Sequence, residues 1–340
     1  MIIDLRSDTV TKPTRQMLEM MMSAEVGDDV YGEDPTVNKL EEKCAKLFGM
    51  DAATFCPSGT MSNQIAINVL TKPCDEIICY EKAHIYKYEG GGLAGNSHVS
   101  VRLIKGKRGI LNREDVEKNI NVDDEHYPVT SVVALENTVV SQAGSYYSLN
   151  DIVEIYELCR SRGVALHLDG ARIFNALVES GISALQMGKY FETISICLSK
   201  GLGTPVGSVL ISKKKWAKEI RRKRKVFGGG MRQVGILAAA GIYALDNHVD
   251  RLKDDHRRAK ELEKVLIDLP YVFSVMPVDT NIIIFELEKG VGCQRFLSKI
   301  GEHNIKALDF HNDQIRLVTH LDFDDNMLEK TIEVLKKISF

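Results

Sequence analysis

Two polar side chains follow apolar, strand-like runs in the middle of the chain. Asp169 directly follows the run 164–168, and Lys200 follows the run 194–198 with Ser199 between them. Because successive strands of an α/β sheet end at the same edge, we expect the carboxylate and the amine to lie close together. Neither residue type is needed to build a strand, so the pair indicates chemistry.

This pair suits a pyridine cofactor that carries an aldehyde. The amine of Lys200 can form a Schiff base, and the carboxylate of Asp169 can keep the ring nitrogen protonated, so that the ring acts as an electron sink. Upstream, Ser58, Gly59 and Thr60 stand before a helical stretch whose free N–H groups would face a phosphate. A Ser-Gly-Thr run alone is also ordinary capping sequence. Because Asp169 and Lys200 follow it along the chain in the expected order, the Ser-Gly-Thr run predicts a pyridoxal phosphate site.

His84 is a third candidate, because it follows the apolar run 77–80 by four residues. An imidazole there would sit near the edge of the sheet where ligands bind. It could stack on the cofactor ring and touch the reacting side chain. The alternative is a partly buried, hydrogen-bonded histidine without a role in chemistry.

Alternating strand and helix patterns must position these residues. Apolar runs at 77–80, 131–135, 164–168 and 194–198 are separated by amphipathic stretches such as 150–162. This order predicts an α/β fold, a mostly parallel sheet with helices on both faces. A further strand at 206–212 should be antiparallel, because the preceding turn is too short for a crossover helix.

The C-terminal part follows a different pattern, after one long helical region at 233–269. The expected elements are strands at 281–287 and 314–319 and helices at 292–302 and 325–337. We therefore expect a large cofactor-binding domain at 1–245, including the N-terminal segment, and a smaller C-terminal α/β domain at 246–340.

Composition limits the class of protein. The 340 residues are 44% hydrophobic and 27% charged, which is typical of a soluble globular protein. The net charge of -3 gives no argument for nucleic acid or an anionic membrane as partner, and we expect neither. The basic run 221–225 fits a solvated helix face better than a localisation signal or a nucleic-acid patch. Seven cysteines without CxxC pairs or His/Cys spacing indicate a reducing compartment and no metal site. With no signal peptide or long apolar run, we expect a cytoplasmic protein.

Several segments together resemble the threonine aldolases, over essentially the whole chain. These enzymes belong to the beta-eliminating lyases of the aspartate-aminotransferase-like pyridoxal phosphate superfamily, fold type I. The matching segments are 4–11 (DLRSDTVT), 26–35 (VGDDVYGEDP), 57–61 (PSGTM), 83–85 (AHI), 169–172 (DGAR), 199–202 (SKGL), 228–233 (GGGMRQ) and 315–320 (IRLVTH).

The resemblance implies a role for each matching residue at the cofactor. Lys200 would form the Schiff base, Asp169 would pair with the ring nitrogen and His84 would stack on the ring. The residues expected to bind the cofactor further include Ser58, Gly59, Thr60, Arg172 and Arg232, the last reaching the phosphate of a neighbouring subunit.

The resemblance also implies a substrate site. Ser7, Arg172 and Arg316 would hold the substrate carboxylate, for which bidentate guanidinium geometry is suited. Tyr31 would contribute across the dimer interface, and Tyr88 would be one of the residues that bind the substrate. His126 matches a second family histidine near the substrate hydroxyl.

The implied activity is retro-aldol cleavage of L-threonine or L-allo-threonine to glycine and acetaldehyde, in threonine catabolism and glycine formation. The implied assembly is a homo-oligomer, a tetramer built as a dimer of dimers. His84 and His126 both remain candidates for the base that takes the hydroxyl proton. β-Elimination or racemisation is an alternative reaction. A more distant alternative is a noncatalytic binding protein on the same fold. The presence of Asp169 and Lys200 argues against it.

One segment departs from the family pattern. After Glu-Asn-Thr the family usually has a His-Asn pair and soon two glycines, whereas this chain has Val139 and Val140 and one glycine fewer. The change is either a variable loop or a sign that the enzyme accepts a different β-hydroxy amino acid or catalyses another reaction.

Overall fold

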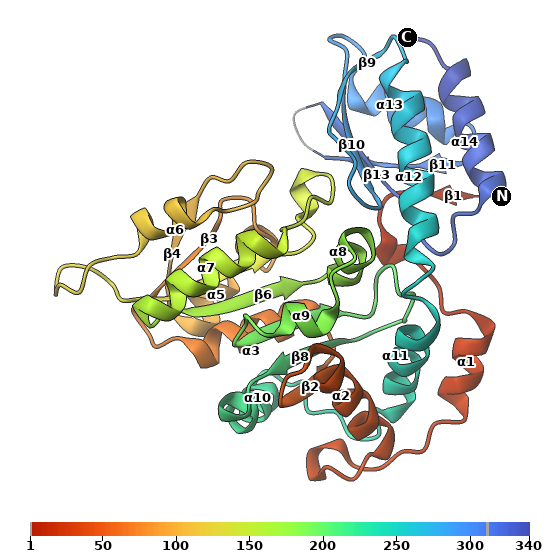
Figure 1. The fold of residues 1–340 in the computed structure, drawn as a ribbon. Coiled ribbons are helices and arrows are strands. Elements are labelled where there is room, and N and C mark those ends of the chain that lie inside the picture. The colour runs from red at the N-terminus through yellow and green to blue at the C-terminus, as the bar shows by residue number, and fades with distance from the viewer. Residues whose placement is uncertain (1, 311–312) are drawn as a thin grey trace.

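A seven-stranded sheet forms the centre of the larger part of the molecule (Figure 1). The computed structural model describes residues 2–310 and 313–340. In spatial order the strands are β2 (Ala52–Cys56), β8 (Ser208–Ser212), β7 (Thr193–Cys197), β6 (Ala165–Gly170), β5 (Thr130–Glu136), β3 (Glu76–Tyr80) and β4 (Ser100–Ile104). Strands β3 to β7 are parallel to one another, and β8 is antiparallel to both of its neighbours. The predicted sheet is confirmed, including its antiparallel strand.

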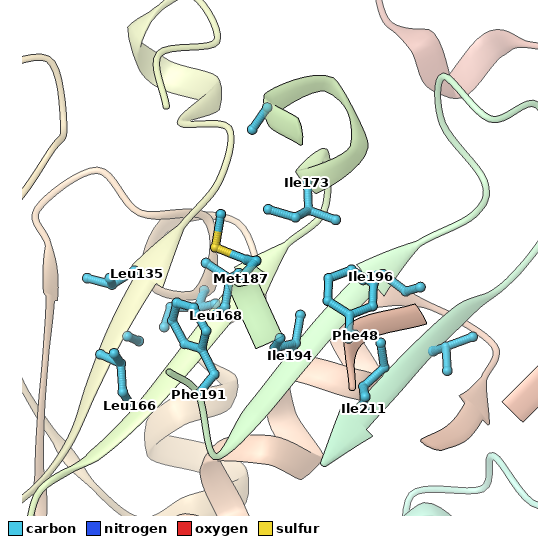
Figure 2. Close-up of a cluster of buried hydrophobic side chains, with 14 of the residues drawn as sticks. Phe48, Leu135, Leu166, Leu168, Ile173, Met187, Phe191, Ile194, Ile196 and Ile211 are labelled. Atoms are coloured by element: carbon cyan, nitrogen blue, oxygen red, sulfur yellow. The ribbon is translucent and has the colours of Figure 1, made fainter. Parts of the chain in front are cut away.

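Helices cover both faces of this sheet, because its strands are buried on both sides. Leu210 of β8 packs with Ile65 and Ile220 on one face. Its neighbour Ile211 points to the other face, where Figure 2 shows it near Phe48. The helices of this part are α1 (Arg15–Met22), α2 (Pro35–Phe48), α3 (Gly59–Leu70), α4 (His84–Lys87), α5 (Gly92–Ser97), α6 (Arg113–Asn119), α7 (Leu149–Arg162), α8 (Ile173–Ser180), α9 (Ala184–Gly188), α10 (Lys214–Val226) and α11 (Gly235–Asn247), with 3-10 turns η1 (Asp8–Val10), η2 (Asp29–Tyr31) and η3 (Val140–Gln142).

A smaller antiparallel sheet lies in the C-terminal part (Figure 1). Its strands are β12 (Leu308–Asp309), β13 (Gln314–Val318), β10 (Ile282–Leu287) and β9 (Val272–Val275), accompanied by helices α12 (Leu252–Ile267), α13 (Cys293–Gly301) and α14 (Asp325–Lys337). Leu262, Phe285 and Phe296 belong to its core. The elements expected at 281–287, 292–302, 314–319 and 325–337 are confirmed.

The N-terminal segment packs with this smaller part. Strand β1 (Ile3–Asp4) pairs in parallel with β11 (Ile305–Lys306), and Ile3 and Leu5 are fully buried in the smaller core. The sequence pattern had placed the segment with the larger part, because two residues of strand carry too little signal to show their partner. The boundary at 245/246 stays a prediction.

The single helical region expected at 233–269 is two helices, α11 and α12, separated by residues 248–251. At the break, the Nδ1 of His248 donates to the carbonyl of Leu202 at 2.7 Å, and Arg251 donates to the carbonyl of Gly201 at 3.4 Å. The hydrogen bonds from these two residues therefore hold the turn that follows Lys200. None of the helices in the described ranges is long and apolar enough to cross a membrane.

Candidate active site

Two adjoining cavities open at the carboxyl edge of the large sheet, where the parallel strands end. The first cavity, of about 290 Å³, is lined by residues 57–60, Asn63, His84, Glu89, Asp169, Ala171, Cys197, Ser199, Lys200 and residues 205–206. The second, of about 390 Å³, is lined by Ser7, Thr9, His84, Tyr88, Glu136, Val140, Ala171, Arg172, Lys200, residues 308–310 and Arg316. The two cavities share His84, Ala171 and Lys200.

Asp169 and Lys200 line the first cavity together, as the positions of their strands predicted. Asp169 accepts hydrogen bonds from Asn63 Nδ2 at 3.0 Å and from the backbone N–H of Ala171 at 3.2 Å. The Nζ of Lys200 lies 3.2 Å from the Sγ of Cys197. A fixed carboxylate and an amine therefore face one space.

The N-terminus of α3 closes the first cavity at another side. Ser58 caps the helix, with its side chain accepting from the N–H of Met61 at 3.1 Å. The first N–H groups of a helix lack partners within it and attract anions. A Cβ on Gly59 would lie 2.6 Å from the Sγ of Cys197, so only glycine fits this close approach. Ser58, Gly59 and Thr60 thus form the cradle expected for a phosphate.

His84 is held by two buried carboxylates. Its Nδ1 lies 3.1 Å from Oε1 of Glu89, and its backbone N–H donates to Oε2 of Glu136 at 3.0 Å. Burial alone would lower the pKa of His84, but the hydrogen bond to Glu89 and the charges of Asp169, Glu89 and Glu136 raise it. The carboxylates around His84 therefore favour its protonated form beside both cavities.

Glu136 faces Asp169 in register across β5 and β6. Its Oε1 accepts from the N–H of Val140 at 2.9 Å, and its side chain lines the second cavity. Burial, followed by the nearby charge of Asp169, raises the pKa of Glu136 to about 7. A carboxyl group that can gain or lose a proton at neutral pH therefore borders this cavity.

Two guanidinium groups reach the second cavity. Arg172 is paired with Asp8 by two hydrogen bonds, of 2.7 and 2.6 Å. Arg316 donates only to the carbonyl of Arg6, at 3.1 Å, and among the described residues its buried Nε has no hydrogen-bond partner. Burial and the charge of Arg172 lower the pKa of Arg316 to about 10. This cavity therefore favours an anion, and a carboxylate matches the guanidinium donors.

Apart from Tyr31, three further residues were expected at the substrate, and two of them, Ser7 and Tyr88, line the second cavity. Of the two valines that depart from the family pattern, only Val140 lines it. Val139 is fully buried in the large core and lines neither cavity. The side chains of neighbouring residues in an extended segment point in opposite directions.

The third, His126, is not brought to either cavity within this chain. It precedes β5 and so lies at the opposite edge of the sheet from Glu136, which ends that strand. Its side chain is 80% exposed, with Nδ1 at 2.7 Å from Asp124.

Tyr31 and Arg232 also lie outside both cavities. Their side chains meet at the surface, where the guanidinium carbon lies 5.8 Å from the Tyr31 ring centre. Arg232 also donates to Asp28 at 2.7 Å, and Tyr31 is 72% exposed. Their expected roles depend on a neighbouring subunit.

The sequence patterns did not single out five residues that the structure places at the site, namely Asp8, Asn63, Glu89, Glu136 and Cys197. Polar residues that hydrogen-bond to other site residues do not form a periodic pattern that the sequence could reveal. Asp8 does occur in a segment that matches the family, next to Ser7, and Glu136 opens the Glu-Asn-Thr run before the segment that departs from it.

The first cavity fits the phosphate ester of a pyridine aldehyde. The α3 cradle suits the phosphate, the Asp169 carboxylate suits a protonated ring nitrogen, and the Lys200 amine suits the aldehyde. The residues present therefore agree with pyridoxal phosphate.

Comparison with known structures defines the class of fold. The structure of the threonine aldolase of Leishmania major superposes with a TM-score of 0.84 at 22% identity, over 98% of this chain and 99% of that one. The expected fold, that of the fold type I pyridoxal phosphate enzymes, is confirmed.

Comparison of sequences is more specific. Residues 4–289 match the beta-eliminating lyase family. The low specificity L-threonine aldolase of Escherichia coli K12 is 42% identical over 338 residues, 96% of each chain. A probable low-specificity L-threonine aldolase of Arabidopsis thaliana is 38% identical over 346 residues, 99% of this chain and 97% of that one. The chain belongs to the beta-eliminating lyase family.

Proposed function

We propose that this chain is a pyridoxal phosphate-dependent lyase that cleaves L-threonine, L-allo-threonine and related β-hydroxy-α-amino acids to glycine and an aldehyde such as acetaldehyde. The observation that carries the proposal is the junction of the two cavities at Lys200 and His84. A cavity that suits the cofactor thereby opens onto one that suits an amino acid carboxylate. The named activities of the relatives described above agree with this reaction.

Each residue has a separate task in this proposal. Arg316 and the remaining donor of Arg172 bind the substrate carboxylate and so orient the Cα–Cβ bond that breaks. When bound, the cofactor accepts the electron pair released from that bond. Asp169 keeps the ring nitrogen charged, and Lys200 anchors the aldehyde carbon.

We assign removal of the β-hydroxyl proton to His84. This histidine lines both cavities, whereas His126 lies at the other edge of the sheet of its own chain. The hydrogen bond to Glu89 and the surrounding carboxylates raise the pKa of His84 against the effect of burial, so the proton it takes is stabilised. A contribution of His126 would have to come from a neighbouring subunit.

We also propose that the active form is a homo-oligomer, a tetramer made as a dimer of dimers. Gly229 lies against Met61 in the first turn of α3, so the glycine-rich segment 228–230 adjoins the phosphate cradle. Arg232 and the exposed Tyr31 follow on the same surface. A two-fold interface on this surface would place Tyr31 and Arg232 of each subunit beside the phosphate cradle of the other subunit.

We further propose a cytoplasmic location and a role in threonine breakdown and glycine formation. All seven cysteines are free thiols in the structure, and Cys74 is exposed. Such thiols suit a reducing compartment.

The experiment that tests the function is a product assay with purified protein and pyridoxal phosphate. L-threonine, L-allo-threonine and phenylserine should each give glycine and the matching aldehyde, and Lys200→Ala should give neither. Ammonia and a 2-oxo acid in place of glycine would indicate β-elimination, the reaction in the family's name. Inversion at Cα would indicate racemisation. Wild-type protein that takes up no cofactor would refute the proposal altogether.

A further inference from the structure

We propose that Asn63 is a positioning residue whose amide holds the carboxylates of Asp169 and Glu89 together as hydrogen-bond acceptors beside the cofactor cavity. The inference rests on the proposed function, since Asp169 is the expected partner of the ring nitrogen. It goes further because it links the carboxylate of Asp169 to the carboxylate of Glu89, which holds His84.

The geometry of the amide carries the inference. The Nδ2 of Asn63 donates to Oε1 of Glu89 at 2.8 Å and to Oδ2 of Asp169 at 3.0 Å. Asn63 is only 2% exposed, and the polar atoms of His84, Glu89 and Asp169 lie within 4.8 Å of one another. The NH₂ group of Asn63 therefore donates one hydrogen to each of two neighbouring carboxylates.

The orientation of this amide is fixed from behind by His167. The Oδ1 of Asn63 lies 3.2 Å from Nε2 of His167, whose Nδ1 lies 2.8 Å from the hydroxyl of Thr193. Burial lowers the pKa of His167 to about 4, so the ring is neutral at pH 7. Nε2 then donates to the amide oxygen while Nδ1 accepts from Thr193. A flipped Asn63 would lose this bond and turn its oxygen toward two carboxylates.

The arrangement has an electrostatic consequence. Two carboxylates at this separation repel each other. The two N–H donors of Asn63 offset that repulsion at both groups, whereas Gln64 Nε2 donates only to the other oxygen of Glu89, at 2.7 Å. The titratable groups that face this cluster are His84, Glu89, Glu136, His167, Asp169 and Lys200. Asn63 is the group that supports Asp169 and Glu89 at once.

Gln64 supplies a matched control. Asn63→Ala and Gln64→Ala each remove one amide donor from Glu89, but only Asn63→Ala removes a donor from Asp169. The readouts are the ¹⁵N chemical shift of the ring nitrogen in holoenzyme loaded with ¹⁵N-labelled cofactor, and the cofactor dissociation constant. Neither readout requires threonine cleavage, so failure of this inference is distinguishable from failure of the proposed function.

We expect Asn63→Ala to move the ring-nitrogen shift toward that of the unprotonated ring and to weaken cofactor binding by about ten-fold, a size usual for loss of a supporting hydrogen bond. Gln64→Ala should leave the ring-nitrogen shift near the wild-type value. Both variants should move the pH profile of kcat through Glu89 and His84. Asn63→Ser also lacks the bridging amide, and the same shift is expected from it if the alanine variant does not fold. An unchanged ring-nitrogen shift in a folded Asn63 variant, or an equal change in Gln64→Ala, would overturn the inference.

Discussion

Arg172 and Asp8 form a buried, two-bonded ion pair that joins the end of β6 to the N-terminal segment. Burial by itself would raise the pKa of Asp8, but the charge and hydrogen bonds of Arg172 lower it to about 2. The pair is therefore ionised at every pH at which the protein would be studied. Since Arg172 is already paired with Asp8, Arg316 is the guanidinium of the second cavity that has no carboxylate partner among the described residues.

Arg316→Ala should therefore weaken substrate binding strongly. Loss of a guanidinium that pairs with a desolvated carboxylate costs roughly 2–5 kcal/mol, and KM for threonine should rise accordingly. Cofactor absorbance should survive, because Arg316 does not line the first cavity. Arg6→Ala is a suitable control, since its side chain pairs with Asp4 at the surface. An unchanged KM in Arg316→Ala would place the carboxylate elsewhere.

Lys200→Ala should abolish both turnover and covalent attachment of the cofactor. Lys200 is the lysine whose amine lines both cavities of the described structure. Borohydride reduction of the wild-type holoenzyme should fix the cofactor on this residue, which peptide mass mapping can locate. A label on another lysine, or none with cofactor added, contradicts the assignment.

Val140 and Val139 should have separable effects, which the sequence pattern alone did not distinguish. Val140→Ala enlarges the second cavity and should change the ratio of kcat/KM for phenylserine over threonine by roughly ten-fold, within the 1–3 kcal/mol that one apolar contact supplies. Val139→Ala should leave that ratio alone and destabilise the core by about 1–3 kcal/mol. A ratio unaffected by Val140→Ala would make the segment a variable loop.

Glu136 should make stability depend on pH. Its pKa is raised from 4.5 to about 7, so the folded chain keeps a proton that the unfolded chain releases between these values. Stability should therefore fall as pH rises through this window, by up to about 3 kcal/mol. In Glu136→Gln, the thermal midpoint should fall less between pH 5 and pH 8 than in wild type. Glu125→Gln, at an exposed position, should retain the wild-type dependence.

Subunit sharing can be tested by mixing inactive variants. If Arg232 serves the partner's cradle, a mixed dimer of Lys200→Ala and Arg232→Ala contains one site with both groups intact. Co-refolding the two should restore part of the wild-type activity. Lys200→Ala with Arg316→Ala should restore none, because both residues line one cavity of the same chain. Full activity in a demonstrated monomer would exclude the shared site.

Residues at strand ends were predictable because strand order alone determines which edge they reach. Asp169 and Lys200 follow apolar runs that the structure confirms as β6 and β7. The break between α11 and α12 was missed, because it depends on His248 bonding to a carbonyl far along the chain, at Leu202. Asn63 was missed for a similar reason, since its partners lie 26 and 106 residues away.

The pairing of β1 with β11 joins the N-terminal segment to a part of the chain that is synthesised late. The two cavities are therefore completed at different points of synthesis. Every residue that lines the first cavity lies between Pro57 and Val206, whereas the second needs Ser7 from the start of the chain and Arg316 from near its end. A ribosome therefore completes the positions that receive the cofactor about a hundred residues before those that select the amino acid. A chain that ends between Val206 and Arg316 keeps the former set and lacks Arg316.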